Sequence, residues 1–251
     1  MTDKEQAASP HLSRRALLVS AGATGAGLAF AQSHGILAAM AAGDSGKPER
    51  VQDVLDITAT NEAFGVTLVG TVLDAAANRS YSPAIPPAVI KALTNVRAQE
   101  QFHLDFFLRA GGKPRTDTFY LADPKLLKDP KTLFADLVEL EDAAIAAAMA
   151  GMRTLTREKR VDLVKANFQY AAEEAEHRLL ANHSLGTRPA NDIAFAPALF
   201  TTMAQFYAVL KKKGIVGGSL GGKKITYPGA GQIDGSHVIY RTPAGPQVSC
   251  A

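Results

Sequence analysis

The two stretches that decide the fold of this 251-residue chain are Glu100-Gln101-Phe102-His103 and Glu174-Ala175-Glu176-His177. Each is a Glu-x-x-His pattern within a long helical stretch. Three residues along an α-helix correspond to about 300° of rotation, so the carboxylate and the imidazole project from the same face. Two such helices could together hold one pair of metal ions.

The sequences that follow the two patterns are also similar. The first pattern is followed by Gly111, Gly112 and Pro114, and the second by Gly186 and Pro189. Glycine commonly ends a helix, and proline prevents its continuation. Both patterns therefore occupy the last third of a helix, which indicates an internal duplication of a helix pair.

A duplicated helix pair predicts one more inward carboxylate in each half of the chain. Glu62 is the only glutamate between residues 51 and 73, whereas residues 133–149 contain both Glu139 and Glu141. Glu141 lies on the apolar stripe of its helix, at steps of three or four residues, and Glu139 does not. A buried metal ligand must point inward with the core residues, so we predict that Glu141 is the inward carboxylate.

The fourth helix has a more polar face around Glu174 than the other three helices have around their carboxylates. Tyr170 lies one turn before Glu174 on this face. We therefore expect Tyr170 to support the site by hydrogen bonding to a ligand carboxylate.

Four ionised carboxylates facing an apolar core would repel one another unless a cation paired with them. Two divalent ions supply about four positive charges, and two neutral imidazoles complete the ligand set without adding charge. The predicted metal ligands are Glu62, Glu100, His103, Glu141, Glu174 and His177. This mixture of oxygen and nitrogen suits iron or manganese better than calcium or a thiolate-bound metal.

The constellation resembles the ferritin-like di-metal carboxylate proteins over residues 51–213. Within that superfamily, Leu140-Glu141-Asp142 and the stretch 189–197 are similar to the exported ferritin-like domain proteins, a group related to a desiccation-related protein of plants. The resemblance implies an all-α fold: a ferritin-like four-helix bundle with a fifth helix at residues 50–213, and an irregular Gly/Pro-rich tail at 214–251.

The resemblance also implies two bound iron ions, or alternatively two manganese ions, bridged by Glu100 and Glu174. It favours metal oxidation or oxygen and peroxide chemistry in stress protection, either ferroxidase-like or manganese-catalase-like. Relatives often carry a tyrosine late in the third helix, where this chain has Ala146-Ala147-Ala148, which argues against a tyrosine-dependent redox step. The alternative is a non-enzymatic structural or stress-related envelope protein that keeps the fold.

The N-terminal sequence Ser13-Arg14-Arg15-Ala16-Leu17-Leu18 precedes an uncharged stretch at residues 16–43. This pattern resembles a bacterial twin-arginine signal peptide, at residues 1–31, with cleavage possible as late as residue 42. Several polar and glycine residues make the stretch a poor membrane anchor. We therefore expect a partner in the twin-arginine export machinery, no stable membrane anchor, and a periplasmic or extracellular location.

Proline and capping residues predict where the other helices begin. Pro86-Pro87 opens the second helix, Asp129-Pro130 the third, and Thr154 or Thr156 the fourth. A fifth helix is expected at residues 198–213. The long link at residues 111–128 would cross the bundle, residues 238–240 could form a short strand, and the rest of the tail would wrap the bundle.

The composition sets limits on partners. The net charge of +3 is spread along the chain, so we expect no nucleic-acid surface. Lys211-Lys212-Lys213 is expected to complement the negative end of the fifth helix. Cys250 is the single cysteine, so no intramolecular disulfide can form. The sequence leaves a homo-oligomer open.

Overall fold

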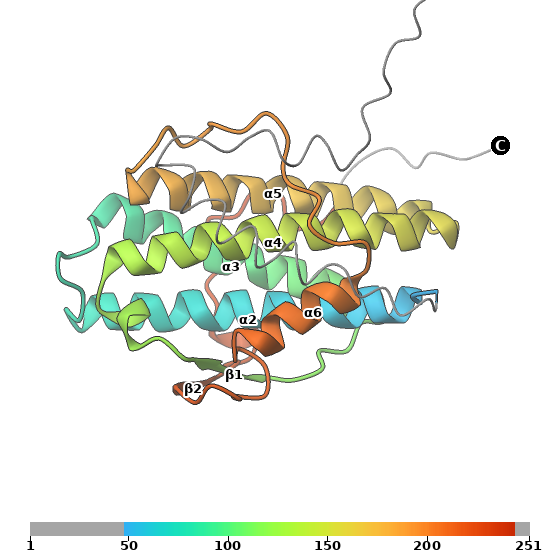
Figure 1. The fold of residues 1–251 in the computed structure, drawn as a ribbon. Coiled ribbons are helices and arrows are strands. Elements are labelled where there is room, and N and C mark those ends of the chain that lie inside the picture. The colour runs from blue at the N-terminus through green and yellow to red at the C-terminus, as the bar shows by residue number, and fades with distance from the viewer. Residues whose placement is uncertain (1–47, 244–251) are drawn as a thin grey trace, which may run out of the picture. The chain divides into compact units, whose positions relative to one another are not determined.

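The computed structural model describes residues 48–243. The predicted signal segment and Cys250 lie outside this range. The described chain is mainly helical, as predicted for the class, and adds a small two-stranded sheet. With the labels of Figure 1, the helices are α2 (Val51–Ala77), α3 (Pro87–Arg109), α4 (Pro130–Arg157), α5 (Val161–Leu185) and α6 (Met203–Lys212), with short 3-10 turns η1 (Pro124–Leu127) and η2 (Ala230–Gln232).

The four long helices pack as two sequential pairs. Helix α2 runs along α3, helix α4 runs along α5, and contacts between α2 and α4 join the two pairs (Figure 1). Helices α3 and α5 contact each other much less closely. The apolar stripes of the helices meet in a common core that includes Val54, Leu104 and Phe134, each at most 2% exposed.

Helix ends follow the predicted chemistry at several positions. Pro87 occupies the first turn of α3, where its missing N–H costs nothing. The Asp129 carboxylate caps α4 by accepting hydrogen bonds from the N–H groups of Lys131 and Thr132, at 3.1 and 3.2 Å. Gly186 ends α5 with a φ of 67°, the left-handed conformation that glycine adopts most readily.

The predicted start of the fourth helix at Thr154 or Thr156 is wrong. Both residues lie inside α4, which continues to Arg157. The Thr154 side chain is buried and donates a hydrogen bond to Glu49 Oε2 at 3.2 Å, so it joins α4 to the segment before α2. The chain reverses at Lys159, whose φ is 57°, and α5 begins at Val161.

The fifth helix is shorter than predicted and has a different beginning. It starts at Met203, because Thr202 and Gln205 form a capping box that fixes the first turn there. At its other end, the Lys213 ammonium contacts Asp136 and Glu139 of α4 at 2.7 and 3.2 Å. Lys213 therefore ties α6 to α4, in addition to lying at the negative end of the helix.

The sheet joins the long crossover to the C-terminal tail. Strand β1 (Thr118–Leu121) pairs antiparallel with β2 (Lys223–Thr226), and Phe119 faces Ile225. The predicted strand at residues 238–240 is absent from the described tail. Instead, the chain turns at residues 236–237, and Arg241 Nε donates a hydrogen bond to the Val238 carbonyl at 3.0 Å.

None of the helices between residues 48 and 243 combines the length and the apolar character needed to cross a lipid bilayer.

Candidate metal centre

The structure brings all six predicted ligands together at the centre of the bundle. Each long helix contributes one Glu, and α3 and α5 also contribute one His each. The side chains form two overlapping groups, in each of which one donor atom per residue lies within 4.8 Å of the others. The groups are Glu62, Glu100, His103 and Glu174, and Glu100, Glu141, Glu174 and His177.

Glu100 and Glu174 belong to both groups, whereas each of the other four residues belongs to one. A carboxylate has two oxygen atoms, so it can bind two neighbouring cations at once. The shared positions therefore suit bridging carboxylates. Glu62 with His103, and Glu141 with His177, each belong to one group only.

The cluster is deeply buried. Glu62 is 0%, Glu174 1% and Glu100 4% exposed, and His177 is 5% exposed. His103 and Glu141 keep a small part of their surface accessible. Burying several ionised carboxylates carries a free-energy cost larger than their contacts with neighbouring side chains can offset. These carboxylates therefore need protons or cations.

Several donor atoms of the cluster converge without forming hydrogen bonds. His103 Nδ1 lies 3.2 Å from Glu62 Oε2 and 3.4 Å from Glu174 Oε1. Within residues 48–243, none of these three atoms has a hydrogen-bond partner of acceptable geometry, and the same is true of His177 Nδ1. Buried polar atoms are rarely left unsatisfied in native proteins. Their convergence and their chemistry fit a pair of divalent cations.

The metal-free cluster attracts protons. Burial raises the pKa of Glu62 and Glu141 well above the usual carboxyl range. Burial acts on Glu174 as well, but the neighbouring imidazoles outweigh it and hold its pKa below the usual range. Burial lowers the pKa of His103, yet the nearby carboxylates of Glu174 and Glu62 dominate and raise it to about 10. The pKa of His177 is raised by its carboxylate neighbours in the same way.

Gln99 orients one of the two imidazoles. His177 Nε2 lies 3.2 Å from Gln99 Oε1, an acceptor, so Nε2 carries the proton and Nδ1 is left to face the cluster. The sequence pattern does not predict this role. Gln99 directly precedes Glu100, but only the packing of α3 against α5 shows that its side chain reaches the second imidazole.

Tyr170 lies at the edge of the cluster. Its ring meets the ring of His103 edge to face, with centroids 5.1 Å apart. Asn61, which sequence analysis also missed, donates to Glu62 Oε1 at 3.2 Å and reaches the Tyr170 hydroxyl at 3.5 Å. Burial raises the pKa of Tyr170, and the carboxylates of the cluster add to the effect, so its hydroxyl stays protonated. Asn61 thus links Tyr170 to a candidate ligand.

Gly65 makes room for the shared carboxylate Glu100. A Cβ atom at position 65 would lie 2.8 Å from Glu100 Oε2 and 2.9 Å from its carboxyl carbon. Real Cβ atoms do not approach other atoms so closely. Gly65 stands one helical turn after Glu62, and this position in a helix interior is the signal that sequence analysis could have used.

A buried ion pair lies beside the cluster. Each of its two residues directly follows a candidate ligand in the sequence. Asp142 follows Glu141 in α4, and Arg178 follows His177 in α5. Arg178 Nε lies 3.5 Å from Asp142 Oδ1, and the two side chains are 7% and 2% exposed. The pair ties α4 to α5 beside the candidate ligands.

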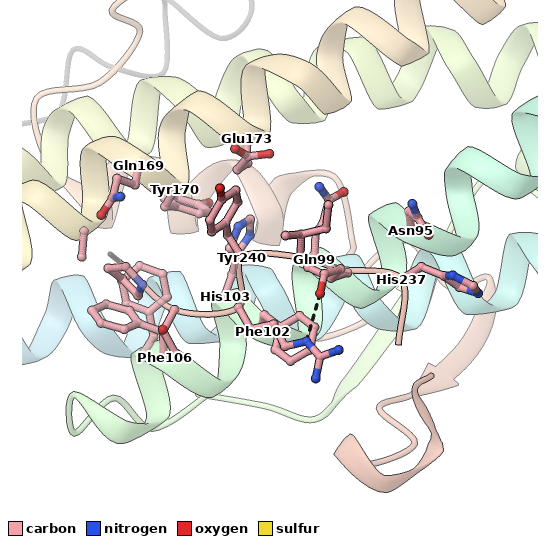
Figure 2. Close-up of a pocket in the computed structure, with 17 residues that line it drawn as sticks. Asn95, Gln99, Phe102, His103, Phe106, Gln169, Tyr170, Glu173, His237 and Tyr240 are labelled. Carbon is pink, nitrogen blue, oxygen red and sulfur yellow. Dashed lines mark hydrogen bonds between the residues drawn. The ribbon is translucent and has the colours of Figure 1, made fainter. Parts of the chain in front are cut away.

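Two cavities adjoin the cluster, and they differ in size. A cavity of about 20 Å³ borders Glu141 and His177, which is room for one water-sized molecule. A pocket of about 350 Å³ borders His103 and Tyr170 (Figure 2). The His103 side chain is 15% exposed and that of His177 only 4%, so the cluster is more accessible from the side of His103.

Searches of protein-family models, curated proteins and solved structures found nothing that matches this chain. What the site does must therefore be inferred from its own residues: buried acidic and histidine side chains that could hold metal ions.

Proposed function

We propose that the chain is an exported ferritin-like protein that binds a pair of iron ions, or alternatively a pair of manganese ions, for metal oxidation or for redox chemistry with oxygen or peroxide. The observation that carries the proposal is the sharing of Glu100 and Glu174 by two groups of buried donors. A single cation would not need both groups. Two adjacent cations would use all six side chains.

The side chains have distinct roles in this proposal. Glu62 and His103 would hold one ion, Glu141 and His177 the other, with Glu100 and Glu174 between them. The bound pair would supply the capacity to give or accept two electrons. Gln99, as the partner of His177 Nε2, would leave Nδ1 as the atom that binds a cation, and Gly65 leaves the space that Glu100 occupies.

The surroundings of the cluster support a reaction with a small oxidant. The cavity beside Glu141 and His177 has room for one water-sized molecule, and apolar residues such as Val69, Leu93 and Phe134 line it. The pocket of about 350 Å³ beside His103 has room for oxygen or peroxide. Apolar walls keep bulk water away from the reacting groups.

The non-enzymatic alternative has an observation in its favour. The raised pKa values of Glu62, Glu141 and both histidines let the metal-free cluster reduce its own charge by taking up protons. Folding would then not require metal, and the bundle could serve as a structural or stress-related envelope protein.

Elemental analysis by mass spectrometry of the purified chain tests the proposal. We expect about two equivalents of iron or manganese per chain, and their loss in the double variant His103→Ala, His177→Ala. The matched control is His183→Ala, which removes an exposed imidazole from the last turn of α5. Folded wild-type protein that binds no metal in vitro would overturn the proposed function. Bound metal without consumption of oxygen or peroxide would favour the alternative.

Export is a separate part of the proposal, because residues 1–47 lie outside the described structure. The pair Arg14 and Arg15 supports it. Replacing both by lysine keeps the charge and removes the twin-arginine pattern. We expect the variant to stay in the cytoplasm of a bacterial host while the wild type reaches the periplasm, and equal export of both chains would refute the twin-arginine route.

A further inference from the structure

The 350 Å³ pocket beside His103 has a wall of aromatic side chains. Phe102, Phe106 and Phe107 come from α3, and Tyr170 comes from α5. Helices α3 and α5 thus form two sides of the pocket. Residues 237–243 of the C-terminal tail form the third side, and Figure 2 shows Tyr240 among them. Because α3 and α5 contact each other little, the space between them is left for the pocket.

The tail is held on α3 by specific contacts. Tyr227 donates a hydrogen bond to Gln101 Oε1 at 2.7 Å. Gly235 packs so closely on Phe102 that a Cβ atom there would lie 2.6 Å from the ring. The guanidinium carbon of Arg241 lies 5.5 Å from the centroid of the same ring. The tail is therefore a built wall of the pocket.

Two large side chains of the tail wall are much more exposed than is usual for their residue types. Ile239 is 85% and Tyr240 84% exposed, although both line the pocket. Exposed apolar surface that lines a concave site is typical of a place where a ligand binds. A molecule that fills the pocket would contact both side chains and also His103, because all three line it.

The geometry points to a binding site for a small, uncharged aromatic molecule, such as a phenol, in this pocket, in contact with the His103 side of the proposed metal centre. Aromatic rings favour stacked and edge-to-face contacts with other rings, and the pocket offers several. Glu173 and Arg241, of opposite charge, both line it, and the charge of His103 is balanced by Glu62 and Glu174 behind it, so a ligand needs no net charge. The volume is within the range of small-molecule sites. The position relative to the metal rests on the proposed function, whereas the pocket itself does not.

The test is calorimetric titration of 1-naphthol into the metal-free full-length chain at neutral pH. We expect saturable binding at one site, and weaker binding of decahydro-1-naphthol, which has the same skeleton without aromatic rings. The variant Ile239→Ala, Tyr240→Ala should bind about tenfold more weakly, because two apolar contacts are lost. Gly235→Ala should also weaken binding, because it displaces the tail from Phe102.

The matched control is Phe195→Ala, which removes an aromatic ring that is 91% exposed and does not line the pocket. It should bind 1-naphthol as the wild type does. Absence of saturable binding by the wild type, or equal binding by the tail variant and the wild type, would overturn the inference.

A second titration tests the position beside the metal centre. In protein loaded with cobalt(II), 1-naphthol should shift the visible absorption bands of the metal, and binding without any shift would refute contact with the His103 side. If the chain takes up no cobalt, the proposed function loses support, while the titration of the metal-free protein still decides whether the pocket binds aromatic molecules.

Discussion

Replacing Gly65 by alanine should weaken metal binding without unfolding the protein. The new Cβ would lie 2.8 Å from Glu100 Oε2, and ordinary contact begins at 3.4 Å, so the carboxylate must move by at least the difference of 0.6 Å. Metal–ligand distances tolerate about 0.2 Å. The end of a glutamate side chain moves easily, so we expect the fold to persist and the affinity to fall about 10- to 100-fold, as for other supporting contacts.

Gly70→Ala is the matched control on the same helix. Its Cβ would meet the Arg97 guanidinium at 2.7 Å, which can swing away and is not a candidate ligand. Both variants gain helix propensity, about 1 kcal/mol at an interior position. The assay is calorimetric titration with manganese(II) or cobalt(II), with thermal unfolding followed by circular dichroism. If Gly65→Ala and Gly70→Ala bind metal equally well, Glu100 is not a metal ligand in the position seen here.

The candidate ligands and the side chains around them can each be tested. His103 has a pKa of about 10 in the folded metal-free protein and 6.5 as the ordinary value. Its stabilising effect is therefore full below pH 6.5 and is lost as the pH rises through 10. Chemical denaturation should show the metal-free protein losing on the order of a few kcal/mol over that interval, and a flat profile would contradict this. Asp142→Ala should lower the free energy of unfolding by about 3 kcal/mol, because it leaves Arg178 buried without its carboxylate, and an unchanged denaturation midpoint would argue against the ion pair. Gln99→Leu should weaken metal binding by about tenfold through the lost orientation of His177, with secondary structure unchanged by circular dichroism; undiminished affinity would exclude the orienting role.

Much of the fold could be predicted because its signals are local in the sequence. The proline and Asp129 positions predicted where α3 and α4 begin, and glycine predicted the end of α5. The choice of Glu141 over Glu139 used helix periodicity alone. The structure places Glu141 in the cluster, and Glu139 instead contacts Lys213.

The errors concern features that depend on distant partners. Threonine often caps a helix with its hydroxyl group. Thr154 instead lies inside α4, where its hydroxyl donates a hydrogen bond to Glu49. Residues 238–240 have β propensity but find no partner strand among the described residues, whereas Ile225 faces Phe119 of the crossover. Gln99 acts on an imidazole of another helix, 78 positions along the chain. None of these pairings is encoded in a local pattern.

The cost of the cluster to the fold helps to distinguish the two functional proposals. A bundle that served only as a structural element would be at least as stable with apolar residues in place of buried carboxylates, since desolvation outweighs most gains from pairing. This chain instead buries Glu62, Glu100 and Glu174 almost completely, and Glu62 Oε2 and Glu174 Oε1 have no hydrogen-bond partner among the described residues. Buried groups that lower stability and also lack hydrogen-bond partners are typical of binding and catalytic sites. The cost of the cluster therefore favours metal chemistry over a purely structural role.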